Sequence, residues 1–468
     1  MAASLPASSV KVSSGLYPRS VKPAPRPLPV HRFFLQFVRN PLRIVPEAAY
    51  REGMVVRERR TGGKAAWITD PGLIEDVLIR NAGALEKSEL EKRVLTRSVG
   101  DGVLTSDGPL WRWQRRIMSP LFRASEIQAY VPVMSKVAAE QVQRWRGEES
   151  GWKRVDRDMT EATFAIIARS MLAGGEPAET GTIKRATERY LSRVSWEVAY
   201  TIIGVPRWVP HPGTLRMHRA AKALRSSVEM LIARRRTDDA AGKPAGQDLL
   251  SRLLAARDPE SGEPMSETQL VNNLLTLLEA GHETTAKALT WTLYLLARAP
   301  EWQSAVRDEV RSVNAHELIT AADLSKLPLL HQVLKESMRL YPPAPSIARR
   351  LVQPVTVGGE RFEPGDMMIF PIFCIHRHRR LWANPDLFDP DRFAPALEKT
   401  YARTQYMPFG AGPRICIGNT FAMTEAAVLL AAFVRDAQFD WDGKHEPEPI
   451  SRVTLRPKGG MRLLVSLL

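Results

Sequence analysis

Apolar residues recur at helical spacing from Glu267 to Arg298 and predict the most informative helix of the chain. One stripe of this helix has a middle of small side chains. The stripe consists of Leu277, Ala280, Gly281, Thr284 and Ala288. A glycine inside a helix costs about 1 kcal/mol relative to alanine, so we expect something to approach closely at Gly281. A flat cofactor and a crossing helix both fit that requirement.

The rest of the chain is patterned mainly as helices. They are predicted over 126–146, 159–172, 329–341 and 419–434, with two long helices between 182 and 236 separated by a proline-rich break at 204–213. Short strands are predicted over 55–59, 65–69, 353–357, 360–362 and 367–370, with a last hairpin over 453–466. The segment from Leu85 to Gly108 is predicted to be a mobile loop that covers a ligand. We therefore expect a mainly helical protein with few strands.

A glycine-rich loop precedes the helix predicted over 419–434. It reads Phe409-Gly-Ala-Gly-Pro-Arg-Ile-Cys-Ile-Gly418, and its glycines allow positive φ angles. Cys416 then lies just before a helix N-terminus, where backbone N–H groups lower the pKa of a thiol and favour a thiolate. A thiolate on a rigid loop is a metal ligand or a nucleophile. The alternative is that Cys416 is one more buried small hydrophobic residue.

The spacing of Phe409, Gly412, Arg414, Cys416 and Gly418 resembles the haem-ligand loop of the cytochrome P450 family. The resemblance runs from about Pro27 to the C-terminus. It implies a mainly helical haem domain with a small β-rich lobe, in which Cys416 is the axial ligand of the iron. The form without a membrane anchor, as in bacterial members, is the one expected.

Trp111 and Arg115 are four residues apart on one predicted helix face and can both donate to one anionic group. A surface cation–π contact is the alternative. In the resemblance, this tryptophan and basic residue hold a haem propionate, and Arg349 and Arg414 are further propionate donors. The complete set of cofactor-binding residues that the resemblance implies is Trp111, Arg115, Ala280, Gly281, Arg349, Phe409, Arg414, Cys416 and Gly418.

Glu283 and Thr284 place a carboxylate and a hydroxyl beside the small residues of the long helix. The alternative for Glu283 is an ion pair with Lys287, four residues on. The run from Ala280 to Thr285 resembles the oxygen-activation segment of the family, whose acid and alcohol deliver protons. An arginine–proline pair here would indicate a peroxide-using member, so the resemblance implies a monooxygenase.

Glu336 and Arg339 are three residues apart on a helix that ends at prolines, so they can pair on one face. An exposed pair would contribute little, whereas a buried pair would be costly to break. Glu-x-x-Arg resembles the K-helix motif of the family, which bonds to a downstream arginine. The matching residue is Arg392, and Asp391 stands where glutamate is commonest.

Composition limits the partners. The 66 basic and 51 acidic residues give a net charge of +15, which favours acidic partners. Basic residues are scattered and not clustered with aromatics, which argues against nucleic acid. The longest strictly apolar run, Ala426 to Val434, is too short to cross a bilayer. Two cysteines build no disulfide framework, and a reducing, cytoplasmic location is expected.

The chain is expected to hold a basic, disordered arm over 1–26 and one haem domain over 27–468, as a monomer. The arm could alternatively be a targeting segment. The resemblance implies haem b, molecular oxygen, and electrons from NAD(P)H through a ferredoxin or flavodoxin with its reductase, docking near Arg112, Arg116 and Arg414. The expected reaction is hydroxylation or epoxidation of a medium-sized hydrophobic molecule. The expected pocket walls include Val103, Leu277, Ala280, Ile347 and Val453. The alternatives are a haem-thiolate isomerase or peroxygenase, and a non-catalytic haem sensor.

Overall fold

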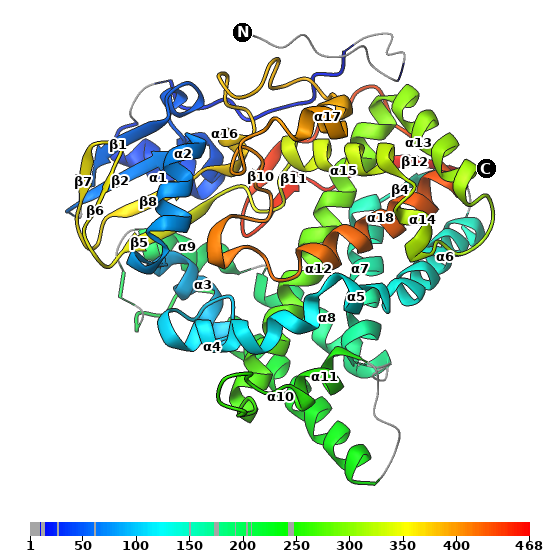
Figure 1. Ribbon diagram of the computed structural model, residues 1–468, viewed down its shortest axis with the longest axis horizontal. Coiled ribbons are helices and arrows are strands. Elements are labelled where there is room, and N and C mark those ends of the chain that lie inside the picture. Colours follow the sequence, from blue (N-terminus) through cyan, green and yellow to red (C-terminus); the bar gives the residue numbers. More distant parts are fainter. Residues whose placement is uncertain are drawn as a thin grey trace.

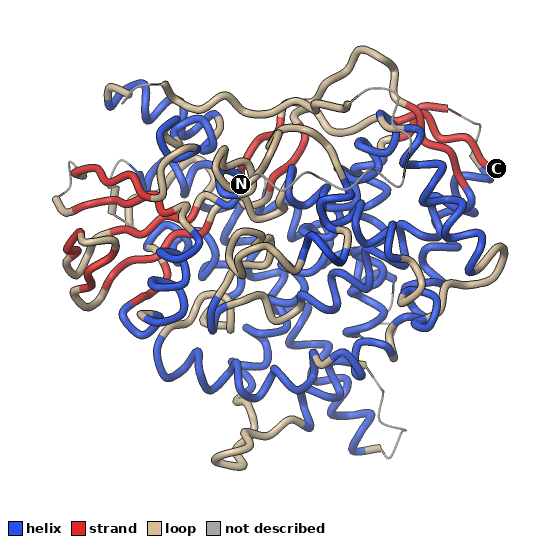
Figure 2. Tube along the Cα trace, turned by 45° about the horizontal axis from the view of Figure 1, so that its top comes forward, coloured by secondary structure: helices blue, strands red, loops and turns tan. Residues whose placement is uncertain are grey.

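The computed structural model describes residues 10, 15–25, 28–59, 62–148, 151–172, 177–191, 193–202, 205–206, 208–241 and 248–468. Helices fill the middle of the molecule, and strands gather toward two of its ends (Figures 1 and 2). The β1–β2 end and the β4–β12 end lie on opposite sides of the helical body in Figure 1.

The helices of the described residues run through the whole chain. Those before residue 200 or close to it are α1 (Val30–Arg39), α2 (Pro71–Glu75), α3 (Glu89–Val99), α4 (Gly108–Met118), α5 (Ala124–Gln128), α6 (Val131–Gly147), α7 (Val155–Leu172), α8 (Pro177–Leu191) and α9 (Val194–Ile202). The later ones are α10 (Thr214–Ala240), α11 (Leu249–Ala255), α12 (Glu267–Arg298), α13 (Pro300–Val313), α14 (Ala321–Leu324), α15 (Pro328–Leu340), α16 (Ile372–Ile375), α17 (Pro395–Glu398) and α18 (Asn419–Asp436).

The strands form small sheets. They are β1 (Met54–Glu58), β2 (Lys64–Ile68), β3 (Leu85–Lys87), β4 (Gly151–Lys153), β5 (Ile347–Leu351), β6 (Val355–Val357), β7 (Glu360–Phe362), β8 (Met367–Phe370), β9 (Ala437–Asp440), β10 (Pro449–Ser451), β11 (Leu455–Pro457) and β12 (Leu463–Leu467). The largest sheet has the order β1-β2-β8-β5-β3, and the others are β6-β7, β10-β11 and β4-β12-β9.

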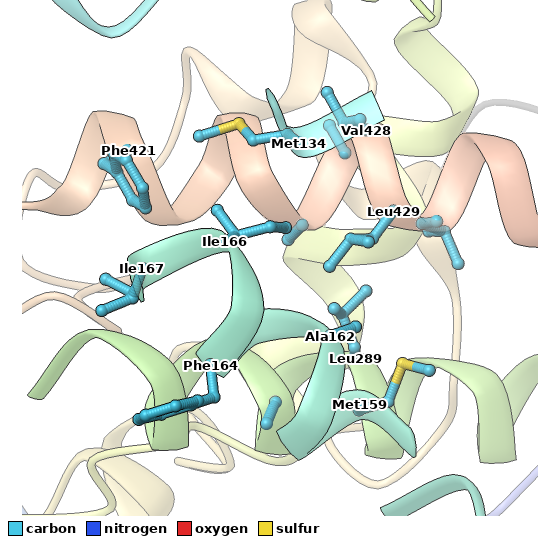
Figure 3. Packing of buried hydrophobic residues seen from close by; sticks show 14 of the residues in the cluster. Met134, Met159, Ala162, Phe164, Ile166, Ile167, Leu289, Phe421, Val428 and Leu429 are labelled. Atoms are coloured by element: carbon cyan, nitrogen blue, oxygen red, sulfur yellow. The ribbon is translucent and has the colours of Figure 1, made fainter. Parts of the chain in front are cut away.

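The long helix α12 is central to the core. A capping box between Ser266 and Gln269 starts it, and Pro300 begins the next helix two residues after it ends. The helix packs against α7, α15 and α18. Figure 3 shows apolar side chains of α6, α7, α12 and α18 filling the space between these helices, among them Ile167, Leu289 and Val428. This packing gives α12 a fixed position, so the polar residues in its middle are held on a rigid element.

The segment from Leu85 to Gly108 differs from the mobile loop that the sequence predicts. It contains β3 and the eleven-residue helix α3. Ser88 and Glu91 form a capping box that starts α3, and Arg93 pairs with the buried Glu197 of α9 at 3.0 Å. These local signals were hidden because α3 is mostly polar in sequence.

Two other predicted segments also differ. Pro132 opens α6 after a break, so the helix predicted over 126–146 is two helices, α5 and α6. The region predicted as two helices between 182 and 236 contains α8, α9 and α10. Part of the predicted break, at residues 203, 204 and 207, lies outside the described residues. Trp208 next to it is 83% exposed and is not a core residue.

The C-terminal hairpin predicted over 453–466 does not form. Strand β11 pairs with β10, whereas β12 pairs with β4 and β9 in another sheet. The chain changes direction at Gly459 and Gly460, whose φ angles are 81° and 88°. A Cβ at Gly460 would lie 2.0 Å from Nη2 of Arg154, so glycine is required there. The turn between the strands is therefore a packed corner.

The predicted N-terminal arm lies partly outside the described residues, but 15–25 contact the globular body. The hydroxyl of Tyr341 donates to the Arg19 carbonyl at 2.8 Å, and Nη1 of Arg19 donates to the Glu446 carbonyl at 2.7 Å. Val21 is buried. The expectation of disorder therefore does not hold for this stretch. Among all described helices, none combines the length and apolarity needed to span a bilayer.

Candidate active site

The loop before α18 is shaped by two glycines. Gly410 and Gly412 have φ angles of 79° and 72°, and a Cβ at Gly412 would lie 2.1 Å from the Leu78 carbonyl oxygen. The N–H of Cys416 donates to the Phe409 carbonyl at 2.9 Å, which closes the loop. Gly418 differs from the prediction, because its φ of −91° is open to any residue. A Cβ there would meet no described atom within 4 Å, so this side of the loop is open.

Cys416 is accessible, yet protein surrounds it closely on most sides, as happens at the bottom of a cavity. Burial raises the pKa of its thiol above the usual value, against the opposing effects of the Gly418 N–H and the Arg115 guanidinium. The prediction that the helix N-terminus lowers this pKa is therefore wrong. Desolvation outweighs the nearby donors, so a stable thiolate at Cys416 needs a further positive charge, which a metal cation supplies.

Arg414, two residues before the cysteine, packs on Trp111 of α4. The guanidinium carbon lies 4.3 Å from the centre of the indole ring, and Nη2 lies 2.5 Å from the Asp107 carboxylate. Nη1 donates to the Ser106 carbonyl at 3.0 Å. The cation–π partner of Trp111 is therefore Arg414. Within the described part of the chain, no carboxylate pairs with Arg115, which remains a half-buried cation near Cys416.

A second group of basic side chains comes from the edge of the largest sheet. Strand β3 pairs with β5 so that Lys87 is opposite Arg349. Arg349 is buried, and its Nη1 lies 3.4 Å from Glu91. Burial lowers the pKa of Lys87 to about 8, although the Glu91 carboxylate opposes the shift. The sequence analysis missed Lys87, because its place beside Arg349 follows only from the strand register.

Together these cations fit an anionic cofactor. Lys87, Arg349, Arg414 and Arg115 lie around the cysteine loop, and Arg414 lies within electrostatic range of Lys87 and Arg349. Repulsion and burial lower the pKa of Lys87, so an added pair of carboxylates would stabilise the cluster. Haem carries two propionates and an iron that binds thiolate. The donor set therefore fits a haem ligated by Cys416.

The middle of α12 presents accessible small residues although most of the helix is buried. Ala280 is exposed, and the hydroxyl of Thr284 donates to its carbonyl at 2.9 Å. Glu283 accepts a hydrogen bond of 2.9 Å from the Thr454 hydroxyl, in the turn between β10 and β11. Its charge also acts on Lys287, but no ion pair within 4 Å joins these two described residues. A carboxylate and a hydroxyl are thus held side by side at an opening.

Gly281 faces away from this opening. A Cβ at Gly281 would lie 2.5 Å from Cδ1 of Ile167 on α7. The close approach is therefore that of a crossing helix, one of the two alternatives that the sequence left open. Figure 3 shows Ile167 at the end of the apolar layer between α7 and α18. Gly281 serves the packing of α12, and the structure gives it no cofactor contact.

Glu279, just before Ala280, is a polar group that the sequence analysis missed. Its Oε2 accepts a hydrogen bond of 3.0 Å from Ser98 at the end of α3, and its Oε1 is buried with no partner among the described residues. Burial raises the pKa of this carboxyl to about 8, and the Glu283 charge adds to the shift. The sequence offered one signal, an acid within an apolar stretch of α12.

The predicted pocket residues lie on elements that meet around α12. The N–H of Val103 donates to the Asn273 side chain at 2.8 Å, one turn before the buried Leu277. Val453 is 39% exposed beside Thr454, which reaches Glu283. Ile347 begins β5, and its Cδ1 would lie 3.2 Å from a Cβ at Gly410. These residues therefore surround the same region from the side of α12 and from the side of the cysteine loop.

The Glu336–Arg339 pair lies outside this region and is fully buried. Arg339 donates to both carboxylate oxygens, at 2.6 and 2.7 Å, and also to the carbonyls of His376, Pro385 and Leu387. Arg392 lies 3.6 Å from Glu336. The pair therefore fastens α15 to the segment that leads to the cysteine loop, which is a structural task.

The two arginines expected to dock a redox partner are not equivalent. Arg112 is exposed on α4. Arg116 is bound to Asp258 through two bonds of 2.6 and 2.8 Å and to Glu260 at 2.7 Å. Hydrogen bonding to Arg116 lowers the pKa of Asp258 well below its usual range. Arg116 therefore holds the loop before α12 and is not free for a partner, and Arg414 is occupied by Asp107.

Comparisons with known proteins agree on one family. A family model described as cytochrome P450 matches residues 22–464. The chain is 31% identical over 444 residues to a cyclooctatin synthase of Streptomyces melanosporofaciens, covering 94% of this chain and 93% of that protein. It is 30% identical over 412 residues to a cytokinin hydroxylase of Arabidopsis thaliana, covering 85% of this chain and 78% of the relative.

A solved structure shares the fold. The crystal structure of the cytochrome P450DA heme domain matches with a TM-score of 0.82 and 25% identity, over 96% of this chain and 99% of that one. The mainly helical architecture with small sheets is thus that of a haem domain, and the use of haem iron and oxygen is general to the family. The chain belongs to the cytochrome P450 family and is a cytochrome P450 monooxygenase.

Proposed function

We propose that residues 27–468 form one haem domain that hydroxylates or epoxidises a medium-sized hydrophobic molecule with electrons from a separate redox partner. The observation that carries this proposal is the acid and alcohol pair on α12. Thr284 is bonded to the Ala280 carbonyl at an opening, and Glu283 is held by Thr454. A peroxide-using enzyme or a haem sensor has no need of a proton-delivering pair.

Each site residue has a proposed task. Cys416 is the iron ligand, and Arg115, Lys87, Arg349 and Arg414 neutralise the propionates. When bound, haem with a thiolate ligand supplies the chemistry that splits dioxygen and oxidises a C–H bond. Glu283 and Thr284 hold and move protons toward that chemistry from the surface of α12.

The substrate class follows from the walls of the site. Val103, Leu277, Ala280, Ile347 and Val453 are apolar, so we infer a hydrophobic ligand. Glu279 adds one carboxyl beside Ala280, with a buried oxygen that lacks a partner among the described residues. A ligand hydroxyl or amine could satisfy it. The named relatives include a cytokinin hydroxylase and an 11-oxo-beta-amyrin 30-oxidase, whose names describe oxidations of organic molecules.

Electrons are proposed to come from a ferredoxin or flavodoxin with its own reductase. Of the three arginines expected at the docking surface, Arg112 is the one that is exposed and that no described carboxylate occupies. Arg112→Glu is expected to slow reduction by an acidic partner and to leave substrate binding unchanged. Arg311→Glu on α13, on the other side of the molecule in Figure 1, is the control. Equal rates for both variants would contradict this docking surface.

The reaction is tested with the holoprotein, a surrogate ferredoxin and reductase, and isotopically labelled dioxygen. Hydrophobic compounds that shift the haem spin state are turned over and analysed by mass spectrometry. Incorporation of one labelled oxygen atom into the product supports a monooxygenase. Product without label would indicate an isomerase, and labelled product formed only with added peroxide as oxygen source would indicate a peroxygenase. Binding without substrate-dependent oxygen consumption would indicate a sensor.

Thr284→Ala separates these alternatives further. In a monooxygenase, loss of the hydroxyl is expected to divert electrons into hydrogen peroxide at the expense of product. Thr284→Ser keeps the hydroxyl and should restore coupling. Unchanged coupling in Thr284→Ala would contradict the proposed role of the pair.

A further inference from the structure

A basic cavity of about 320 Å³ lies where α7 and α12 meet the turn that follows β11. It is distinct from the cysteine loop, none of whose residues lines it. Its charged lining consists of five basic residues and one acidic residue. They are Arg154, Asp156, Lys287, Arg452, Arg456 and Lys458.

The single carboxylate of the lining is already neutralised. Asp156 accepts bonds of 2.8 and 2.9 Å from Arg154 and one of 3.0 Å from the N–H of Met461. Burial opposes ionisation of Asp156, but these donors hold its pKa below the usual range. Asp156 therefore leaves the other basic side chains of the cavity without compensation.

Two of those cations have no acidic partner among the described residues. The Lys287 ammonium lies 3.5 Å from the Thr160 hydroxyl, and no carboxylate lies within 4 Å of it. Arg456 is exposed at the mouth and takes part in no ion pair of the described chain. Burial lowers the pKa of Lys287, as expected for an ammonium group held away from water without a counterion.

The remaining two cations leave the charge excess in place. Nη1 of Arg452 donates to the Val38 carbonyl at 2.7 Å, which is a neutral acceptor. Burial lowers the pKa of Arg452, and the Arg456 charge lowers it further. Lys458 is mostly exposed and lies 3.6 Å from Glu448. Repulsion between neighbouring guanidinium groups is thus built into the cavity wall.

The rim of the cavity is built from glycine. Gly459 and Gly460 have positive φ angles, and Arg154 packs where a Cβ of Gly460 would be. A Cβ at Gly459 would meet no described atom within 4 Å, so the rim is open there. A small anion can therefore enter without displacing side chains, and the volume is at the lower end of ordinary ligand pockets.

We propose that this cavity binds a doubly charged phosphate group, such as a phosphate monoester or a diphosphate. Lys287 and Arg456 would contact it directly, and Arg452 would add charge. A phosphate monoester carries between one and two negative charges near neutral pH and offers three acceptor oxygens, which matches several unpaired donors better than a single carboxylate does. The group could belong to a free phosphorylated molecule or to a lipid headgroup.

The test uses the holoprotein and inorganic pyrophosphate, with binding followed by calorimetry at low and at physiological ionic strength. Arg456→Gln removes an exposed donor without disturbing the fold. Arg403→Gln removes the same charge from an exposed arginine outside the cavity and is the matched control. We expect Arg456→Gln to weaken binding about tenfold or more, and Arg403→Gln to change it less than about twofold. Lys287→Gln should weaken binding similarly.

Absence of pyrophosphate binding, or equal loss in Arg456→Gln and Arg403→Gln, would overturn the proposal, because the latter indicates only a response to net charge. Vesicles distinguish the two sources. Binding to phosphatidic acid vesicles but not to phosphatidylcholine vesicles, abolished by pyrophosphate and by Arg456→Gln, would identify a lipid headgroup. Binding of pyrophosphate without binding of vesicles would identify a free phosphate compound. Unchanged haem absorption in each variant confirms that the protein is folded.

Discussion

The hydroxyl of Thr454 donates a hydrogen bond of 2.9 Å to the Glu283 carboxylate. The two residues are 171 positions apart, and the bond joins the turn after β10 to the middle of α12. It fixes the acid next to Thr284, whose own hydroxyl is bonded to the Ala280 carbonyl. The proton-delivering pair is thus oriented by a residue that the sequence motif does not contain.

Thr454→Val should therefore slow turnover without weakening substrate binding. Without the hydrogen bond, the Glu283 carboxylate adopts several orientations, and we expect a loss of about tenfold, smaller than the 10²-fold or greater loss of removing an acid–base group outright. The solvent isotope effect on oxygen consumption should rise. Thr454→Ser keeps the donor and should retain the wild-type rate. Equal rates in the valine and serine variants would contradict this role.

Gly281→Ala should destabilise the protein, because the new Cβ would lie 2.5 Å from Cδ1 of Ile167. Overpacking of this kind costs about 1–3 kcal/mol, measured as a loss in the free energy of unfolding. The Gly281→Ala/Ile167→Ala double variant should recover part of the loss of the Ile167→Ala background, since the clash is absent there. Gly147→Ala, where a Cβ meets no described atom within 4 Å, is the control. A neutral Gly281→Ala would contradict the crossing-helix explanation.

Glu279 predicts a pH dependence of stability. Burial raises its pKa from 4.5 to about 8, so between these values the folded protein keeps a proton that the unfolded chain releases. Stability therefore falls as pH rises through this window, by at most about 1.4 kcal/mol per pH unit for one group. The loss is complete above the folded pKa.

Glu279→Gln removes this dependence. The variant should gain stability over wild type progressively as the pH is raised from about 5 to about 8, as measured by denaturant unfolding. Glu363→Gln, an exposed carboxyl, should show no such trend. Parallel pH profiles for Glu279→Gln and wild type would show that Glu279 titrates normally.

Arg339→Lys tests the buried pair. Lysine keeps the charge but cannot reproduce the two-pronged contact with Glu336 or the bonds to three carbonyls. The cost is expected to be on the order of 3–5 kcal/mol, enough to reduce the yield of folded holoprotein sharply. Arg361→Lys changes an exposed pair with Glu363 and should cost less than about 1 kcal/mol. Similar stabilities for the two variants would contradict the structural role of Arg339.

The sequence predicted those parts of the fold that depend on local pattern. The bounds of α12 follow from apolar spacing and its capping box, and α15 ends where prolines forbid continuation. Helix α3 was missed, because its stability comes from pairs such as Arg93 with Glu197, more than a hundred residues away. Strand β12 was assigned to the wrong hairpin, because its register with β4 and β9 has no local signal.

The candidate site shows the same division. The motifs located Cys416, Glu283, Thr284 and Arg349 in the sequence, but the environment of each depends on tertiary contacts. Burial reversed the expected shift of the Cys416 pKa, and Ile167 explained the glycine that could have served a cofactor. Lys87 and Glu279 belong to no motif. They were recognisable only once the strand pairing and the end of α3 had placed them beside the site.

The central claim is that Cys416 is the thiolate ligand of a haem, and the absorption spectrum of the reduced protein with carbon monoxide tests it most directly. Wild type and Cys374→Ala, which removes the other cysteine, should both show the strongly red-shifted Soret band of thiolate ligation. Cys416→Ala should lose that band. A band typical of histidine ligation in wild type, or a red-shifted band that survives in Cys416→Ala, would contradict the account.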